Sequence, residues 1–402
     1  MTRTPQCWAW ASGRDAWDDA AHELAERAAR WCEPLAGPPF IVLASTPHHA
    51  RRLPDLAARV QQASGGLVVA CVSPGVAVAG HNLARGAALG AFGVAGFAAS
   101  CVTLEELVDA PRDAFGGAPG PQGPPDLAGV FLLGDASSTP TVRLLPAISA
   151  SLGTCPVLGA LLPAREGDAP PVAIADDAGA RSISAGVAVA LRGNASCTPM
   201  LAQGCRPVGP ARSVTKARGT LVLDLDDAPA LPTLQRAAGA EDLRGWCLAL
   251  IPGEDAGARP GRDDVVVREI RGQDAQSGGV ALPEPIADGT RVQLHRPDGA
   301  VAAADLELLL DVQRLREPPL GALLVRSLDR PGAMVEDARR VGRAFAPPTP
   351  GPERARAGRP VDPDARPFPA LAIGSAAEIA RGRAGPRVHA LAACAWLVRP
   401  MS

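Results

Sequence analysis

Residues 40–72 carry the pattern that most constrains the fold. Residues 40–44 and 67–72 are short apolar runs of strand length, and residues 53–62 between them have the periodicity of a helix. A strand, a helix and a strand this close together are typical of a β-α-β unit, whose two strands pair in parallel. We therefore predict an α/β fold of two related lobes, with layered sheets and helices packed outside.

Further apolar runs extend this pattern along the 402 residues, a length that favours two domains. Residues 86–102 carry no charge, but this stretch is at the lower limit of length for a membrane-spanning helix and is rich in Ala and Gly. We therefore expect buried sheet there. No fixed-period repeat is visible, which argues against a solenoid. We predict helices at 15–31, 140–152, 229–238 and 303–316, and strands at 129–134, 155–162, 187–191, 221–225, 265–270, 291–295, 320–325, 370–374 and 388–398.

The composition excludes several classes of protein. Lys and Arg total 40 against 42 Asp and Glu, a net charge of −2, so no overall basic field attracts nucleic acid or an anionic membrane. The nine cysteines include no C-x-x-C pair, which argues against structural zinc and thioredoxin-type exchange. Residues 1–12 lack the apolar run of a signal peptide, and Lys216 is the only lysine, as GC-rich bacterial coding favours. We expect a cytoplasmic bacterial protein with reduced thiols, no metal and no cofactor.

The most distinctive segment is Gln203-Gly204-Cys205-Arg206-Pro207-Val208-Gly209. Two glycines and a proline predict a tight, rigid turn. An arginine held on such a turn can bind a carboxylate or phosphate through two parallel hydrogen bonds, and backbone N–H groups near Gly204 can assist. In the alternative interpretation Arg206 pairs with a carboxylate of its own chain and Cys205 belongs to the core.

This segment, followed by residues 214–219 and 223–231, resembles the end of a FIST N domain (F-box and intracellular signal transduction). Three upstream turns resemble turns of the same family, at residues 44–49, 69–76 and 132–135. The second half resembles a divergent FIST C domain at residues 321–325, 373–379 and 388–390, but residues 326–330 replace the family's glycine turn. The resemblance implies three segments: a helical extension at 1–36, a FIST N-like domain at 37–240 and a FIST C-like domain at 241–402 with a flexible loop at 346–369.

The resemblance implies an intracellular sensor that binds a small, anionic ligand, an amino acid or an organic acid, between its two lobes. Ligands of open α/β sheets bind beyond the carboxyl ends of the strands, where several of the matching turns lie. A signalling protein is the expected macromolecular partner, and nucleic acid and membrane are not expected. The candidate ligand-binding residues are Gln203, Gly204, Cys205, Arg206, Thr215, Ser45, His48, Cys71, Ser73, Ser375 and Glu378.

Two other functions stay open at this point. A cysteine-dependent hydrolase or transferase would use Cys205 or Cys71 as its nucleophile, although no complete catalytic set is visible and we do not expect an enzyme. A scaffold that binds no ligand would have a filled crevice and a large exposed apolar patch.

Overall fold

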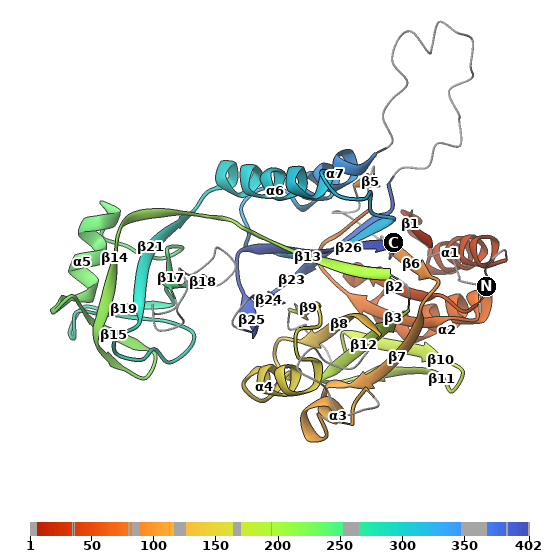
Figure 1. Ribbon diagram of the computed structural model, residues 1–402, viewed down its shortest axis with the longest axis horizontal. Coiled ribbons are helices and arrows are strands. Elements are labelled where there is room, and N and C mark those ends of the chain that lie inside the picture. Colours follow the sequence, from red (N-terminus) through yellow and green to blue (C-terminus); the bar gives the residue numbers. More distant parts are fainter. Residues whose placement is uncertain are drawn as a thin grey trace, which may run out of the picture.

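The computed structural model describes residues 6–33, 35, 37–78, 81–82, 89–111, 113–115, 126–163, 170–193, 195–251, 265–346, 368–382 and 385–400. This part of the chain forms a main body and a smaller lobe (Figure 1). Three six-stranded sheets build the main body, and one eight-stranded sheet builds the small lobe. The α/β fold with layered sheets and outer helices is confirmed.

The first sheet is built around the β-α-β unit at residues 40–72. Its strand order is β1-β6-β2-β3-β10-β11, and β2 pairs with β3 in parallel as expected. The connecting helix α2 ends at Gly65, which has a φ of 66° and so adopts the left-handed conformation that glycine accepts at helix ends. The bounds are β1 (Gln6–Ser12), α1 (Trp17–Cys32), β2 (Phe40–Ser45), η1 (Pro47–Arg52), α2 (Leu53–Ser64), β3 (Leu67–Val72), β4 (Val76–Val78), β5 (His81–Asn82) and β6 (Leu89–Ala95).

The second sheet repeats this order with residues from later in the chain. Its order is β7-β12-β8-β9-β24-β25, and its central strands β8 and β9 are again parallel and joined by a helix, α4. The bounds are β7 (Ala98–Thr103), α3 (Leu104–Asp109), β8 (Leu127–Asp135), α4 (Thr141–Leu152), β9 (Val157–Leu162), β10 (Val172–Asp176), β11 (Gly179–Ile183), β12 (Gly186–Arg192) and β13 (Ala195–Gln203).

The third sheet has the same plan, with the order β13-β26-β22-β23-β4-β5 and the parallel pair β22 and β23. Helix α7 joins that pair, and α6 precedes it. The bounds are α6 (Gly299–Arg314), β22 (Gly321–Ser327), α7 (Met334–Phe345), β23 (Ala370–Ser375), β24 (Ala377–Gly382), β25 (Gly385–His389) and β26 (Ala392–Pro400).

The chain thus passes three times through one structural unit: an edge strand, a helix, a β-α-β unit, a hairpin and a returning strand. Each hairpin joins the sheet of another unit, since β4–β5 lie in the third sheet, β10–β11 in the first and β24–β25 in the second. The sequence has no fixed-period repeat, and this structural repetition was not predicted. The units share a pattern of buried strands rather than residue identities, and the third contains a long insertion, so no fixed period appears in the sequence.

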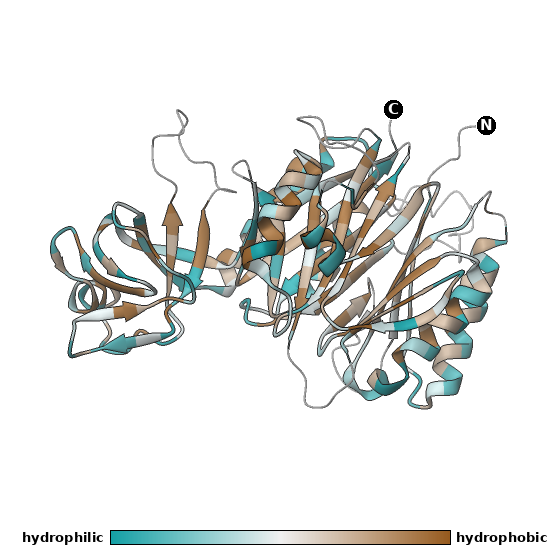
Figure 2. Ribbon diagram, turned by 90° about the horizontal axis from the view of Figure 1, so that it is seen from below, coloured by the Kyte–Doolittle hydropathy of each residue, from teal (hydrophilic) through white to brown (hydrophobic). Residues whose placement is uncertain are grey.

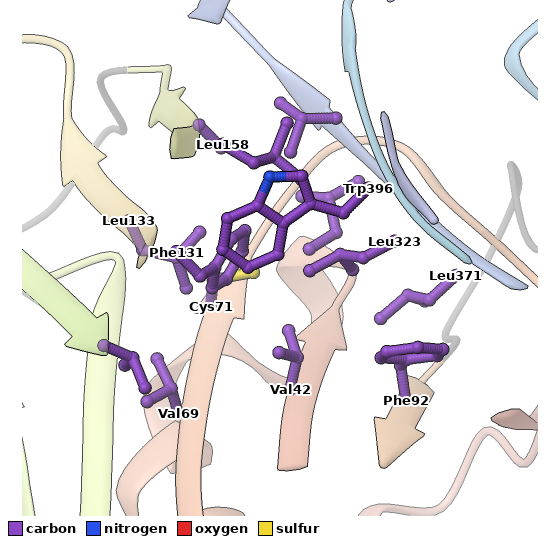
Figure 3. Close-up of a cluster of buried hydrophobic side chains, with 14 of the residues drawn as sticks. Val42, Val69, Cys71, Phe92, Phe131, Leu133, Leu158, Leu323, Leu371 and Trp396 are labelled. Atoms are coloured by element: carbon purple, nitrogen blue, oxygen red, sulfur yellow. The ribbon is translucent and has the colours of Figure 1, made fainter. Parts of the chain in front are cut away.

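One apolar core fills the space between the three sheets. Phe92 from the first sheet, Phe131 from the second and Trp396 from the third are all buried there (Figure 3). The outer faces are covered by α1 and α2, by α3 and α4, and by α6 and α7, respectively. Figure 2 shows the strands of the main body mostly brown, as expected of sheets that are buried on both faces.

The small lobe is an insertion in the third unit, between β13 and α6 (Figure 1). The predicted domain boundary at residue 240 falls inside this lobe, just after α5, and strands from both sides of that residue share the second and third sheets. Residues 6–32, predicted as an extension, supply β1 and α1 of the first unit. The bounds are β14 (Cys205–Arg218), β15 (Leu221–Leu225), β16 (Ala228–Pro229), α5 (Ala230–Ala238), β17 (Cys247–Ile251), β18 (Val266–Glu269), β19 (Gly272–Asp274), β20 (Gly279–Ala281) and β21 (Arg291–Pro297).

Most of the individual strand and helix predictions hold, and one detail differs. The charge-free stretch at 86–102 contains β6 and β7 where it is described, and no helix in the described ranges is long and apolar enough to cross a membrane. The strand predicted at 388–398 is two strands, because Leu391 has a φ of 57° and breaks the extended run. Most of the loop predicted at 346–369 lies outside the described residues.

Candidate functional site

Three of the predicted serines lie together at the carboxyl ends of the parallel strands. Ser45 ends β2, and its carbonyl oxygen accepts a hydrogen bond from the Ser73 N–H at 2.8 Å. The Ser73 hydroxyl lies 2.6 Å from the Gly75 carbonyl oxygen and 2.8 Å from that of Gly374, which precedes Ser375. The interlocking of the first and third sheets, which the sequence does not show, brings these serines into one buried group.

Glu378 extends this group into the core between the sheets. Its side chain is fully buried, and the Ser375 hydroxyl donates to its Oε1 at 2.7 Å. Its Oε2 has no hydrogen-bond partner. Burial raises the pKa of Glu378 from 4.5 to about 8, although the hydrogen bond from Ser375 and the charge of Arg330 oppose that change.

Comparison of the three units shows that the fold does not require a carboxyl group at this position. Glu378 pairs with Ala160 on β9, and the corresponding pairs in the other units are Val76 with Ile373 and Val172 with Cys71. Both valines are completely buried in the same core. A buried carboxyl in place of valine costs stability, which is typical of a functional residue rather than a structural one.

His389 faces Glu378 across the β24–β25 hairpin. It is 2% exposed, and its Nε2 has no partner. Burial lowers the pKa of His389 to about 4, with smaller contributions from the charges of Arg268 and Arg387, so the ring is neutral at neutral pH. The second unit has Ile183 opposite Val172 at the matching position, so a polar pair replaces an apolar pair here.

A second buried group of charges lies behind the serines. The Asp337 carboxylate lies 2.8 Å from the Nε atom of Arg326 and 3.3 Å from that of Arg330. Arg330 also donates to the carbonyl oxygens of Ala202 at 2.9 Å and Ala302 at 2.7 Å. Residues 326–330, which replace the family's glycine turn, therefore fix the third sheet to α7, α6 and the end of β13.

The segment at 203–209 forms the root of the small lobe. Gln203 ends β13 and Cys205 begins β14, so the segment is two strands meeting at Gly204 and the predicted tight turn was wrong. A side chain at Gly204 would lie 2.7 Å from the Leu391 carbonyl oxygen, so this glycine serves close packing rather than a turn. The Asp298 N–H donates to the Gly204 carbonyl oxygen at 3.0 Å, which closes the base of the insertion.

Arg206 points out of this root toward the cap of α6. Its side chain is 55% exposed, and its Nε lies 3.6 Å from Asp298 Oδ2. Cys205 is buried in a small apolar cluster with Cys247 and Leu391. This geometry matches the alternative interpretation, in which Arg206 pairs with its own chain, and the ligand-binding role of Arg206 stays a prediction.

The remaining predicted residues lie apart from the serine group. Thr215 lies on β14 inside the small lobe, where its hydroxyl accepts a hydrogen bond from the Asp227 N–H at 2.9 Å. His48 is exposed on η1, whereas its neighbour His49 is buried. Cys71 is fully buried in the central core, where burial raises its pKa to about 12.

A hollow of about 210 Å³ lies between the small lobe and the main body. The main body contributes Arg387 of β25, whose Nε is buried without a partner. Arg387 pairs with Ala380, which faces the central core, so it lies on the same face of the hairpin as His389 and Glu378. The small lobe contributes the rest of the lining: Leu250, Ile251, Val266, Glu284, Pro285, Ile286, Ala287 and Thr290.

Arg387 was not among the predicted residues, although the alternation of side chains along a strand offered a signal. Arg387 and His389 are two residues apart, and such residues point to the same face. The histidine belongs to the segment that resembles the family, whereas the arginine precedes it. Only the position of the small lobe shows that this arginine lies at a hollow.

Arg268 holds the small lobe against the main body beside this hollow. Its Nη1 donates to the Val388 carbonyl oxygen of β25 at 2.9 Å, and its Nε lies 2.9 Å from Glu284 Oε1. Its Nη2 donates to the second carboxylate oxygen of Glu284 at 3.1 Å, so Arg268 pairs with both oxygens of Glu284.

Replacing Arg268 by alanine is expected to lower the free energy of unfolding by about 1–3 kcal/mol, because the half-buried Val388 carbonyl loses its donor and the buried Arg268 side chain is removed. Chemical denaturation measures this change. The matched control is Arg271→Ala, whose exposed pair with Glu269 contributes less than about 1 kcal/mol. Equal effects of the two substitutions would contradict the role given to Arg268.

Two other hollows offer weaker sites. One of about 490 Å³ follows α1 and is lined only by charged or imidazole side chains, several of which pair with one another. Another lies between α6 and α7 and is lined mainly by charged residues of those helices. Among the described residues, no group of three or more His, Cys, Asp or Glu side chains is placed to hold a metal ion.

Three interlocked units around one core, with a lobe inserted in the third, define an α/β protein of distinctive topology. Residues 40–228 match the family model described as the FIST N domain. This match covers the first two units from β2 onward, β13 and the first strands of the small lobe. FIST domains are associated with signal transduction and small-ligand sensing. The FIST C resemblance of the second half stays a prediction.

Mycobacterial proteins are among its relatives. The uncharacterised protein Rv0628c of Mycobacterium tuberculosis (strain H37Rv) is 28% identical over 320 residues, which cover 76% of this chain and 82% of that protein. The uncharacterised protein Mb0898c of Mycobacterium bovis is 33% identical over 135 residues, which cover 31% of this chain and 35% of that protein.

Proposed function

We propose that this protein is a cytoplasmic signal-transduction sensor that binds a small anionic ligand, an organic or amino acid, in the hollow between the small lobe and the main body. The observation that carries the proposal is Arg387, a guanidinium group at this hollow with a buried and unpaired Nε. An arginine in such a position binds a carboxylate or phosphate through its planar donors.

The charges around the hollow favour an anion. Arg268 and Arg387 are positive, Glu284 is negative and His389 is neutral, so one positive charge is left over. Glu284 is already paired through both of its oxygens, which leaves Arg387 as the group that lacks a counterion. The volume is below the range of about 300–1,000 Å³ for drug-sized ligands, so the ligand is small.

Ligand binding between a lobe and a body also gives a route to signalling. A ligand that contacts both parts stabilises the closed arrangement over any open one, and this shifts the population of lobe positions. The lobe connects to the main body through its root at Gly204 and Asp298, next to the start of α6. A downstream signalling protein is the partner that such a change would serve.

A thermal-shift screen over organic and amino acids tests the proposal, followed by calorimetric titration of any compound that raises the melting temperature. We expect Arg387→Ala to abolish the shift. The matched control is Arg381→Ala, on the other strand of the hairpin, where the preceding residue Ala380 faces the core and Arg381 faces the opposite side. Arg206→Ala in the same screen tests the role predicted for Arg206.

Two outcomes would contradict the proposal. One is a library in which no acid raises the melting temperature. The other is a ligand whose shift survives in Arg387→Ala, which would place its binding site elsewhere.

The proposal is of a binding protein rather than an enzyme, and the state of the thiols supports this. Cys71 is completely buried, and Cys205 is buried beside Cys247, whose pKa is raised mainly by its hydrogen bond with Cys205. A catalytic thiol needs access to substrate and a lowered pKa, and Cys71 has neither.

We expect Cys71 to react with iodoacetamide at neutral pH at least about a thousandfold more slowly in the folded protein than in the unfolded chain, because burial suppresses the thiolate. Cys205 is expected to react slowly as well, because it is buried. Mass spectrometry of timed samples measures each rate, with guanidinium-unfolded protein as the reference. Fast labelling of either cysteine in the folded protein would favour the enzyme.

A further inference from the structure

Helix α6 carries apolar residues on two opposite faces. Ala302, Leu306 and Leu310 of one face are buried against the third sheet. On the other face Leu308 is 60% exposed, Val312 47% and Leu315, which follows the last turn, 88%. These three are most of the large apolar residues that the described chain leaves exposed, the others being Val142 and Leu328.

The exposed residues form a continuous stripe. Val301 and Ala304 extend it toward the start of the helix, where Val301 is half-buried and Ala304 exposed. At about 100° per residue the five residues fall within about 80° of one another around the helix, opposite the buried face. Val301, Leu308 and Leu315 are each seven residues apart, which is the spacing of a helix seam that packs against another helix.

The first unit provides an internal comparison, because α1 occupies the place of α6 there. Ala20, Leu24, Ala28 and Trp31 are the buried residues of α1, at the same spacing as Ala302, Leu306, Leu310 and Gln313. In that alignment Glu26 corresponds to Leu308. The whole stripe of α6 corresponds to polar or charged residues of α1: Asp19, His22, Glu26, Arg30 and Glu33. The fold itself therefore does not call for apolar residues there.

We propose that the α6 stripe is an interaction surface for a second copy of this chain, with the two helices packed antiparallel about a two-fold axis at Leu308. In this arrangement Leu308 meets Leu308 of the other copy, Ala304 meets Val312, and Val301 meets Leu315. Every contact is apolar, and the small Ala304 lies opposite a larger side chain. A surface that pairs with itself in this way is what a two-fold interface requires.

The charges along α6 favour the same orientation. Asp298 caps the start of the helix with its carboxylate, which accepts from the N–H of Ala300 at 2.9 Å, whereas Arg314 and Arg316 lie at its end. Antiparallel packing brings Asp298, at the start of each helix, toward Arg314 and Arg316 of the other copy, and it also aligns the helix dipoles favourably. Parallel packing would place like charges together.

The interface is small, so we expect a weak dimer whose population rises with protein concentration. Sedimentation equilibrium of the full chain over a wide concentration range measures it. Leu308→Glu is expected to halve the particle mass at high concentration, because the two-fold axis places two carboxylates in contact. Leu308 contributes little to the core, and circular dichroism of the variant checks its fold. Glu26→Leu, at the corresponding place on α1, is the control that should leave the dimer unchanged.

Cysteine substitution tests the geometry. Leu308→Cys is expected to form a disulfide-linked dimer under mild oxidation, because the two sulfurs face each other at the axis. Val312→Cys alone is expected to form no disulfide-linked dimer under the same conditions, whereas a mixture with Ala304→Cys is expected to cross-link. Unmodified protein treated identically controls for the native cysteines.

Three results would overturn the proposal. They are a chain that stays monomeric at every concentration, a dimer that persists in Leu308→Glu, and equal cross-linking of Leu308→Cys and Val312→Cys. A monomer that binds an amphipathic helix of another protein through the same stripe would count against the second copy as the occupant.

Discussion

Replacing Asp337 by alanine is expected to lower the free energy of unfolding by about 3–5 kcal/mol, as is typical when one partner of a buried ion pair is removed. The Asp337 carboxylate lies within 3.3 Å of the guanidinium groups of Arg326 and Arg330, and all three side chains are almost fully buried. Without it, two positive charges remain in the interior with only carbonyl oxygens as partners. Urea denaturation followed by circular dichroism measures the change.

The matched control for this prediction is Asp311→Ala on α6. Asp311 also pairs with an arginine, Arg314, but both side chains are more than half exposed, so the loss should stay below about 1 kcal/mol. If the two variants lose the same stability, the buried network does not hold the third sheet to its helices in the way described.

Replacing Glu378 by glutamine is expected to raise the free energy of unfolding at pH 8 by about 2–4 kcal/mol. Each unit of difference between the folded and unfolded pKa of a group corresponds to about 1.4 kcal/mol. The pKa of Glu378 is raised from 4.5 to about 8 in the folded protein, mainly by burial. As the pH rises from 4.5 to about 8, Glu378 loses its proton in the unfolded chain but keeps it in the folded protein. The unfolded state is therefore stabilised relative to the folded state. Below pH 4.5 both states are protonated and this difference disappears.

Denaturation of both proteins between pH 4 and pH 9 measures this effect, and the difference between them removes the contribution of other titrating groups. Glutamine keeps a carbonyl oxygen for the Ser375 hydroxyl and cannot ionise, so its curve lacks the fall that Glu378 causes. Two curves that run parallel across the whole range would show that Glu378 is ionised in the folded protein or is paired there. A ligand that binds near Glu378 would change the same difference, which links this measurement to the sensor proposal.

The β-α-β unit at residues 40–72 shows how much of the fold local sequence patterns predict. Apolar runs of strand length and a helical period between them correctly predicted two parallel strands joined by a helix, which ends at Gly65. The same reasoning found β8, α4, β9, β22 and β23. It did not reveal that these elements form three copies of one unit, because pairing between β4 and β23, or between β24 and β9, joins residues far apart in the chain.

The candidate site divides in the same way. Ser45, Ser73, Ser375 and Glu378 were predicted from turns after strands, and the structure brings Ser73 next to Gly374 and places Glu378 on Ser375. Arg206 was singled out for its neighbours in sequence, yet its partner Asp298 lies across the root of an insertion that no local pattern reveals. Arg387 has no distinctive neighbours, and its significance comes from a lobe folded against it.

The sequence by itself determined the α/β class, most of the strands and helices, and the resemblance to a FIST N domain, because these depend on the order of apolar, polar and glycine residues along short stretches of chain. The tertiary structure alone decided which arginine lies at the hollow, which carboxyl group is buried and which face of α6 is exposed. Those properties depend on burial and charge. Burial in turn depends on which distant strands pair and on where the inserted lobe packs against the main body.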